Sequence, residues 1–150
     1  MNGKKSNGHD AELLCILRGW QELESKAVAS AYDMMSKTSN PLVKMIMDLI
    51  MHDSEKHKLI LQMIIDSLTR EAIYISPDEF RALSEKLNRH METEQEAIRL
   101  AQAALDKCTL VSTHFLLSYL IADEKKHHNL MARLDELSIA SIPTAVSAGA

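Results

Sequence analysis

Residues 53–57 read DSEKH, and residues 123–127, seventy positions further along the chain, read DEKKH. The aspartate, the lysine and the histidine of the two segments coincide in this register. Each segment lies in a stretch whose hydrophobic residues recur every three or four positions, which is the period of an amphipathic α-helix. We therefore expect two equivalent helices, each with acidic and histidine side chains on a largely apolar face.

The helices that precede these two segments repeat in the same register. Glu24 coincides with Glu94. Four apolar positions also coincide, namely Leu13 with Leu83, Leu17 with Leu87, Ala27 with Ala97 and Ala31 with Ala101. Apolar matches alone are common between two amphipathic helices, but four polar matches in one ungapped register are not. The sequence therefore predicts two copies of one helical hairpin, each of which buries its apolar face against the other.

Polar and proline-containing breaks divide the chain into four predicted helices. We place these helices at residues 10–37, 41–68, 77–106 and 110–137. Asn40 can cap the second helix, with Pro41 at its first position, and residues 76–79 (SPDE) form a capping box for the third. Thr109 is the expected cap of the fourth helix.

The composition agrees with a helical fold. The 150 residues include only four glycines and three prolines, with many methionines and few aromatic residues, which favours long helices over a sheet. The predicted fold is all-α, an antiparallel four-helix bundle of two repeated hairpins over residues 10–137. Residues 1–9 are expected to form a flexible N-terminus and residues 138–150 a flexible C-terminal tail.

The charge and the cysteine content exclude several classes of function. A net charge of −4 gives no basic footprint for nucleic acid. No apolar run is long enough to span a membrane, and the first residues do not resemble a secretory signal. Cys15 and Cys108 are the only cysteines, so a site built from four cysteines is excluded. We expect both to be reduced core residues of a cytoplasmic protein.

Several acidic and histidine side chains fall on the predicted apolar faces. Glu24 lies one turn after Trp20 and one turn before Ala27. The same test of spacing selects five more residues, namely Asp53, His57, Glu94, Glu124 and His127. When each hairpin is folded at its turn, Glu24 lies level with residues 54–57, and Glu94 lies level with residues 124–127. We therefore expect these side chains to converge on one layer of the bundle.

Buried carboxylates that lie close together repel one another, and their charge must be compensated. A bound cation compensates it directly. Inward glutamates combined with Glu-x-x-His turns form di-metal sites in helical bundles. Glu124 and His127 have this i, i+3 spacing, which places both side chains on one face of a helix. The sequence therefore predicts a metal centre in the core.

These residues resemble the motifs of the ferritin-like di-iron carboxylate superfamily, which includes the rubrerythrins and bacterioferritins. The resemblance implies two iron ions, or manganese in second place, and Fe(II) oxidase or peroxide-reducing activity. The ligands that it implies are Glu24 and His57 for one metal, Glu94 and His127 for the other, and Glu124 as a bridge. It also implies that Asp53 and Asp123 hydrogen-bond the histidine of the opposite motif and fix its ring.

The first motif departs from the family pattern. Ser54 stands where a bridging glutamate is expected, and Glu55 turns away from the inward face. His90, one turn before Glu94, is a candidate substitute ligand, although packing in the core against Trp20 is the preferred interpretation. The remaining histidines of the helices, His52, His114 and His128, are expected at the surface or flanking the site.

The link between the second and third helices also departs from the pattern. Residues 69–75 would reach only about 23 Å at about 3.3 Å per residue. Ferritin-like folds use a crossover that runs the length of the bundle, which is about 40 Å for a helix of nearly thirty residues. Either the helix ends unwind to lengthen the link, or the bundle has a simple up-down-up-down topology.

Two alternative functions remain open. The missing carboxylate at Ser54 favours a metal-binding or storage module without turnover. Neutralisation of the inward acids by His57, His127 and His90 would instead give a metal-free bundle that serves assembly or regulation. We expect a homodimer or a larger homo-oligomer, and a peroxidase activity would also need an external electron donor.

Overall fold

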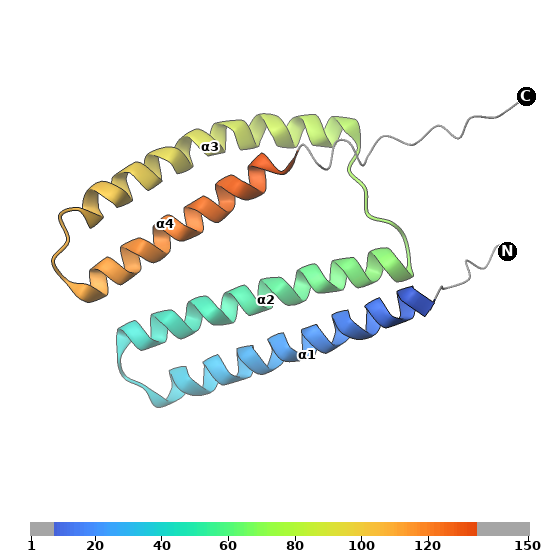
Figure 1. Cartoon of the computed structure of the whole chain (residues 1–150), viewed down its shortest axis with the longest axis horizontal. Coiled ribbons are helices and arrows are strands. Elements are labelled where there is room, and N and C mark those ends of the chain that lie inside the picture. Colours follow the sequence, from blue (N-terminus) through green and yellow to red (C-terminus); the bar gives the residue numbers. More distant parts are fainter. Residues whose placement is uncertain (1–7, 135–150) are drawn as a thin grey trace, which may run out of the picture. The chain divides into compact units, whose positions relative to one another are not determined.

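The computed structural model describes residues 8–134, and over this range the chain contains α-helices and no strand (Figure 1). The helices are α1 (Gly8–Lys37), α2 (Pro41–Thr69), α3 (Pro77–Leu105) and α4 (Val111–Ala132). The predicted bounds of the first three are confirmed to within two residues. The predicted end of the fourth helix, the predicted C-terminal tail and residues 1–7 of the predicted N-terminus lie outside the described residues. Residues 8 and 9, predicted to belong to that N-terminus, lie in α1.

Two of the three predicted caps are confirmed. The Asn40 side chain accepts hydrogen bonds from the backbone N–H groups of Leu42 and Val43, and Pro41 occupies the first turn. Ser76 and Glu79 form a reciprocal capping box, in which each side chain accepts from the backbone N–H of the other residue. These bonds satisfy N–H groups that a helix start otherwise leaves without partners.

The third predicted cap is wrong by one residue. Because α4 begins at Val111, the residue before it is Leu110 and not Thr109. The backbone N–H of His114 donates to the carbonyl of Leu110, which is the first bond of the helical ladder. The preceding turn is tightened by a short backbone bond from Cys108 to Leu105, and the Cys108 thiol lies 3.4 Å from the Leu110 carbonyl oxygen. The connection between α3 and α4 is therefore one residue longer than a cap at Thr109 would make it.

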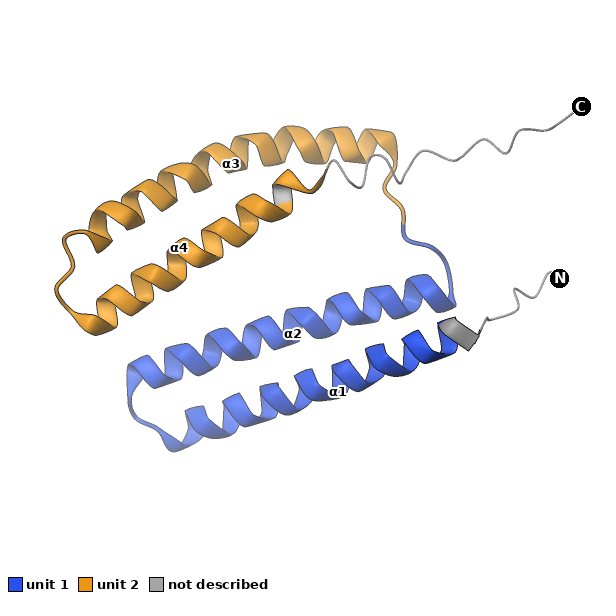
Figure 2. Cartoon of the chain, viewed as in Figure 1, with its two compact units in different colours: residues 1–73 blue, residues 74–150 orange. Residues whose placement is uncertain are grey.

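Helix α1 packs against α2, and α3 packs against α4. The chain accordingly divides into two compact units, residues 1–73 and residues 74–150 (Figure 2). We call the α1–α2 pair the first hairpin and the α3–α4 pair the second hairpin. The prediction of an all-α chain with two repeated hairpins, the components of a four-helix bundle, is confirmed.

In each hairpin the two helices meet along a seam of residues spaced alternately three and four apart, as in a coiled coil. The seam of the first hairpin contains Leu14, Leu17, Gln21, Glu24, Val28 and Ala31 from α1, and Met51, Ser54, Lys58, Leu61 and Ile65 from α2. The seam of the second contains Leu87, Met91, Glu94, Ile98 and Ala101 from α3, and Leu117, Ile121, Glu124 and His128 from α4. Both seams therefore carry polar residues at their centres.

The two seams differ in how much apolar surface they bury. In the first hairpin Leu17, Leu61 and Ile65 form a buried cluster against which Leu14 packs, and Ala31 is buried as well. Among the described residues of the second hairpin, Ile121 is the one buried apolar residue, and the seam residue Glu94 is buried as well. The first hairpin thus buries an apolar cluster in addition to its polar centre, whereas the described part of the second hairpin buries little apolar surface around its polar centre.

The connection between α2 and α3 comprises residues 70–76, because neither helix end unwinds. Seven residues span at most about 25 Å, whereas the 29 residues of α2 extend for about 44 Å. A connection of this length cannot run along a whole helix. The chain therefore differs from the long crossover of ferritin-like folds.

A two-helix hairpin covers only one stripe of each helix, and other large apolar side chains stay exposed on both hairpins. Examples are Leu13 and Trp20 on α1 and Ile60 on α2. The prediction of two core cysteines is wrong for Cys15, which is exposed because it lies beside the seam residue Leu14 and not on the seam. Cys108 is half-buried, and both thiols are free. None of the described helices is both long enough and apolar enough to cross a membrane.

We predict that Leu61→Ala lowers the free energy of unfolding by about 2–5 kcal/mol, because it opens a cavity in the apolar cluster of the first hairpin. The Leu61 side chain is 3% exposed. Leu59→Ala is the matched control, since Leu59 lies on the same helix and is 68% exposed. Urea denaturation measures both values. An equal loss in the control would contradict the assignment of Leu61, rather than Leu59, to the packed face.

Candidate metal site

The second hairpin holds a buried carboxylate whose oxygen atoms make no hydrogen bond. The Glu94 residue is 2% exposed, and neither Oε1 nor Oε2 has a hydrogen-bond partner. Helix α3 places this residue at the middle of the seam, where the packed faces of both helices exclude water. A buried ionised carboxylate in this state is strongly destabilising unless a positive charge compensates it.

Three further side chains surround Glu94. His90 Nε2 lies 3.1 Å from Glu94 Oε1, and His127 Nδ1 lies 3.4 Å from the same oxygen. His127 Nδ1 is also 3.6 Å from Glu124 Oε2. His90 lies on α3, four residues before Glu94. Glu124 and His127 lie on α4, three residues apart from each other. Both histidine side chains are about half exposed, whereas Glu94 is closed off from water.

The arrangement fits a metal ion. One ligand atom from each of Glu94, Glu124 and His127 lies within 4.8 Å of the others. Neighbouring ligands of an ion with bonds of about 2.1 Å are separated by about 3.0–3.4 Å, which is close to the distances found here. Among the described residues this is the one group of three or more side chains placed in this way. Part of the predicted ligand set, namely the buried Glu94 with the half-buried Glu124 and the exposed His127, therefore forms a group that could hold a metal ion.

The equivalent place in the first hairpin is organised by hydrogen bonds. The Trp20 indole Nε1–H donates to Glu24 Oε1 at 2.8 Å, and His57 Nδ1 lies 3.1 Å from the same oxygen. The Ser54 hydroxyl, on a residue that is 6% exposed, also hydrogen-bonds Glu24. Glu24 itself is largely buried, with 13% of its side chain exposed. Glu24 lies level with residues 54–57, as the sequence predicts.

These hydrogen bonds change the acidity of Glu24. The pKa of its carboxyl lies below the ordinary value of 4.5, because the hydrogen bonds from Ser54 and then Trp20 stabilise the ionised form. Burial acts in the opposite direction, and His57 adds a smaller lowering through its hydrogen bond and its charge. Glu24 is therefore held ionised by three donors, and its contacts do not require a cation.

The two predicted supporting aspartates each pair with a lysine of their own helix. Asp53 Oδ1 lies 2.8 Å from Lys56 Nζ, and Asp123 Oδ1 lies 3.3 Å from Lys126 Nζ. Both pairs have the i, i+3 spacing that brings side chains together on a helix surface. The predicted hydrogen bonds to the histidines of the opposite motifs would join the two hairpins, and they stay predictions.

The sequence-based prediction missed the role of one residue, Trp20. It treated Trp20 as an apolar core residue, although the spacing of four residues to Glu24 matches that of His90 to Glu94 and could have indicated a shared role. His128 is expected at the surface or flanking the site, and the structure places it beside the site. The ring of His128 lies on the seam one turn after Glu124, and its Nδ1 is buried without a hydrogen-bond partner.

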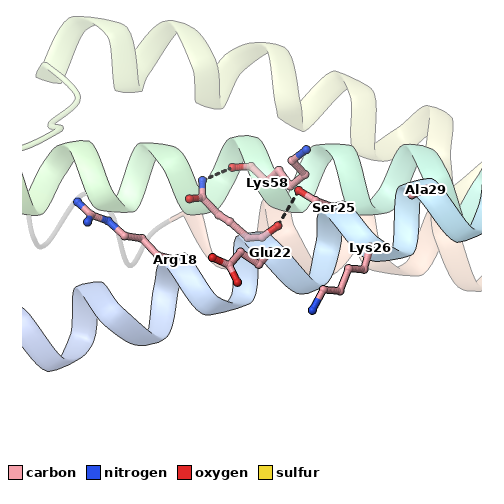
Figure 3. Close-up of a pocket in the computed structure, with 7 residues that line it drawn as sticks. Arg18, Glu22, Ser25, Lys26, Ala29 and Lys58 are labelled. Atoms are coloured by element: carbon pink, nitrogen blue, oxygen red, sulfur yellow. Dashed lines mark hydrogen bonds between the residues drawn. The ribbon is translucent and has the colours of Figure 1, made fainter.

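A separate groove lies on the first hairpin (Figure 3). Charged side chains of both signs line it, among them Arg18, Glu22 and Lys58. The Gln21 amide donates to the backbone carbonyl of Lys58, and the Ser25 hydroxyl donates to the carbonyl of Gln21, so these bonds fix the groove wall. None of the buried atoms that lack a partner among the described residues lies in this groove, and it offers no comparable site.

Comparison of the chain with models of known protein families, with curated proteins and with solved structures found no match. The resemblance to the ferritin-like carboxylate proteins rests on the motif residues themselves.

We predict that the fluorescence of Trp20, the single tryptophan of the chain, reports the titration of Glu24 with a midpoint below pH 4.5. Because the pKa of Glu24 is lowered by folding, its contribution to stability is present above pH 4.5 and is lost as the pH falls through the folded-state pKa. In Ser54→Ala the largest cause of the lowering is gone, so the midpoint should move up toward 4.5. An unchanged midpoint in this variant would contradict the assigned hydrogen bond, and Ser67→Ala, in the same helix, is the control.

Proposed function

We propose that this protein binds a divalent metal ion through Glu94, Glu124 and His127 of the second hairpin. The single observation that carries the proposal is the buried Glu94 carboxylate, which lacks hydrogen bonds and lies among further ligand atoms. A cation at this position would compensate the Glu94 charge and remove the repulsion between Glu94 and Glu124. The proposal thus explains a group that would otherwise be destabilising.

The donor atoms favour iron first and manganese second. Carboxylate oxygens combined with imidazole nitrogen suit first-row ions of intermediate hardness, whereas copper(I) and iron–sulfur clusters prefer sulfur ligands. The two cysteines of the chain lie at positions 15 and 108, away from the ligand positions in sequence. A bound iron ion supplies one-electron chemistry toward O₂ or peroxide.

The resemblance to ferritin-like carboxylate proteins extends the proposal to an activity. In this form the protein is a cytoplasmic di-metal protein that oxidises Fe(II) or reduces peroxide, with Glu24 and His57 as ligands of a second ion. Peroxide reduction would need an external electron donor. Support for this form comes from the repeated register of the two motifs, which places a glutamate next to a histidine in both hairpins.

A second candidate function is metal binding or storage without turnover. The observation that favours it is the saturation of Glu24 by hydrogen bonds from Trp20 and Ser54, because a residue in this state has less need of a metal. A third candidate is a metal-free assembly or regulatory module, in which His90 and His127 neutralise Glu94 as imidazolium ions. The three candidates differ in their response to metal and to O₂.

We predict that anaerobic addition of Fe(II) raises the melting temperature of the full chain. An ion that binds only the folded state adds about 2.7 kcal/mol at a free concentration of 100 Kd. Glu94→Gln should abolish this stabilisation while the helical content is kept, because the neutral amide is a poor ligand of similar shape. Glu92→Gln, at an exposed position of the same helix, is the matched control and should respond as the original chain does.

The same samples test the activity. After the metal content has been measured, O₂ is added, and the near-ultraviolet spectrum and the rate of Fe(II) oxidation are compared with buffer. Rapid, repeated oxidation that is lost in Glu94→Gln supports an oxidase. Metal retention without acceleration supports a binding or storage module. Absence of bound metal, together with an unchanged melting temperature, would contradict metal binding and leave the metal-free module.

A further inference from the structure

The two hairpins can be compared position by position around their central glutamates. The shift of seventy residues relates Trp20 to His90, Glu24 to Glu94, Ser54 to Glu124 and His57 to His127. Two of these four positions carry the same residue type in both hairpins, namely the glutamate (Glu24 and Glu94) and the histidine (His57 and His127). The other two positions differ in a consistent way, because the first hairpin has a tryptophan and a serine where the second has a histidine and a glutamate.

The contacts of the first hairpin show what this exchange does. Trp20 Nε1–H and the Ser54 hydroxyl both donate hydrogen bonds to Glu24. An indole N–H is a donor only and has no lone pair with which to bind a metal. A neutral serine hydroxyl is a much weaker ligand than a carboxylate. The first hairpin therefore satisfies its buried carboxylate with donors that belong to the protein.

In the second hairpin the equivalent positions are occupied by groups that can bind metals. His90 Nε2 lies 3.1 Å from Glu94 Oε1, in the place where Trp20 Nε1 lies 2.8 Å from Glu24 Oε1. The tryptophan contact is a hydrogen bond, whereas the His90 contact leaves Glu94 Oε1 without one. Glu124 replaces Ser54 and adds a second acid in place of a donor. The second hairpin therefore lacks the protein donors that satisfy Glu24.

From this comparison we infer that the second hairpin alone forms a mononuclear metal site with Glu94, Glu124, His127 and His90 as ligands, and that the first hairpin is its metal-free counterpart. The inference rests on the proposed metal binding, sets its stoichiometry at one ion per chain and therefore argues against the di-metal form of that proposal, in which Glu24 and His57 hold a second ion. It also assigns His90 as a fourth ligand, which lies beside the group of three in the structure. Two carboxylates and two imidazoles suit Fe(II), Mn(II) and Zn(II).

The side-chain geometry permits this assignment. Glu94 Oε1 has an imidazole nitrogen on each helix within 3.4 Å, so that one oxygen is shared between His90 and His127. The His90 side chain is about half exposed, and its Nε2 contacts Glu94, which belongs to the group of three. Glu94, Glu124 and the two histidines come from one pair of packed helices.

The inference is tested by exchanging the two differing positions between the hairpins of the full chain. Anaerobic equilibrium dialysis against Fe(II), followed by elemental analysis, gives the number of ions per chain. The original chain should bind one ion, Trp20→His combined with Ser54→Glu should bind two, and His90→Trp combined with Glu124→Ser should bind none. The last variant carries residues that the first hairpin already accommodates, and circular dichroism checks that each variant stays helical.

The role of His90 is tested separately. His90→Trp alone should weaken binding at least about tenfold, the loss that even a change in the outer shell of a site causes. With Zn(II) as a diamagnetic probe, the imidazole nitrogen resonances of His90 and His127 should shift, while those of His57 stay in place. Ser54→Ala is the control in the first hairpin and should leave the stoichiometry at one.

The outcomes separate this inference from the proposed function. Binding of two ions by the original chain, with loss of one in His57→Ala, would overturn the mononuclear site but leave metal binding intact. Binding of one ion with unchanged affinity in His90→Trp would overturn the four-ligand assignment. Binding of no ion by the original chain would overturn the proposed function and this inference together.

Discussion

The constraint on which the rest of the structure depends is a carboxylate at the middle of each hairpin seam. Glu24 and Glu94 occupy positions that the coiled-coil spacing directs toward the partner helix, where water is largely excluded. An ionised group in such a place must be compensated by donors or by a cation. The residues in contact with these glutamates must therefore be able to donate hydrogen bonds or to bind a cation. A purely apolar seam would not require this.

The two hairpins meet this constraint with different chemistry on the same backbone frame. In the first, an indole N–H, a hydroxyl and an imidazole surround Glu24, and the pKa of its carboxyl is lowered as a result. In the second, imidazoles and a further carboxylate surround Glu94, whose oxygens stay without hydrogen bonds. The first arrangement is complete in itself. The second would be completed by a positive charge within reach of both acids.

Much of this organisation could be predicted from the sequence, because it follows from spacing. The helical period, the Asn40 and Ser76 caps and the register of seventy residues place Glu24 level with Ser54 and Glu94 level with Glu124. The helical period shows that each helix has a wide apolar face, but it does not show which residues of that face pack against the partner helix. Cys15 and Trp20 were both expected in the core for this reason, yet they lie beside the seam, where Trp20 can direct its N–H toward Glu24.

The difference between the centres also bears on how each hairpin is held together. The first hairpin buries the cluster of Leu17, Leu61 and Ile65, so the pairing of α1 with α2 has an apolar source of free energy. The described part of the second hairpin buries Ile121 alone among its apolar residues, and Glu94 and Glu124 face each other across its seam. Like charges in this position oppose the pairing of α3 with α4, and a shared cation reverses the sign of that interaction. The proposed metal binding would therefore be coupled to the association of α3 with α4 in the second hairpin, whereas the first hairpin needs no ion to pair.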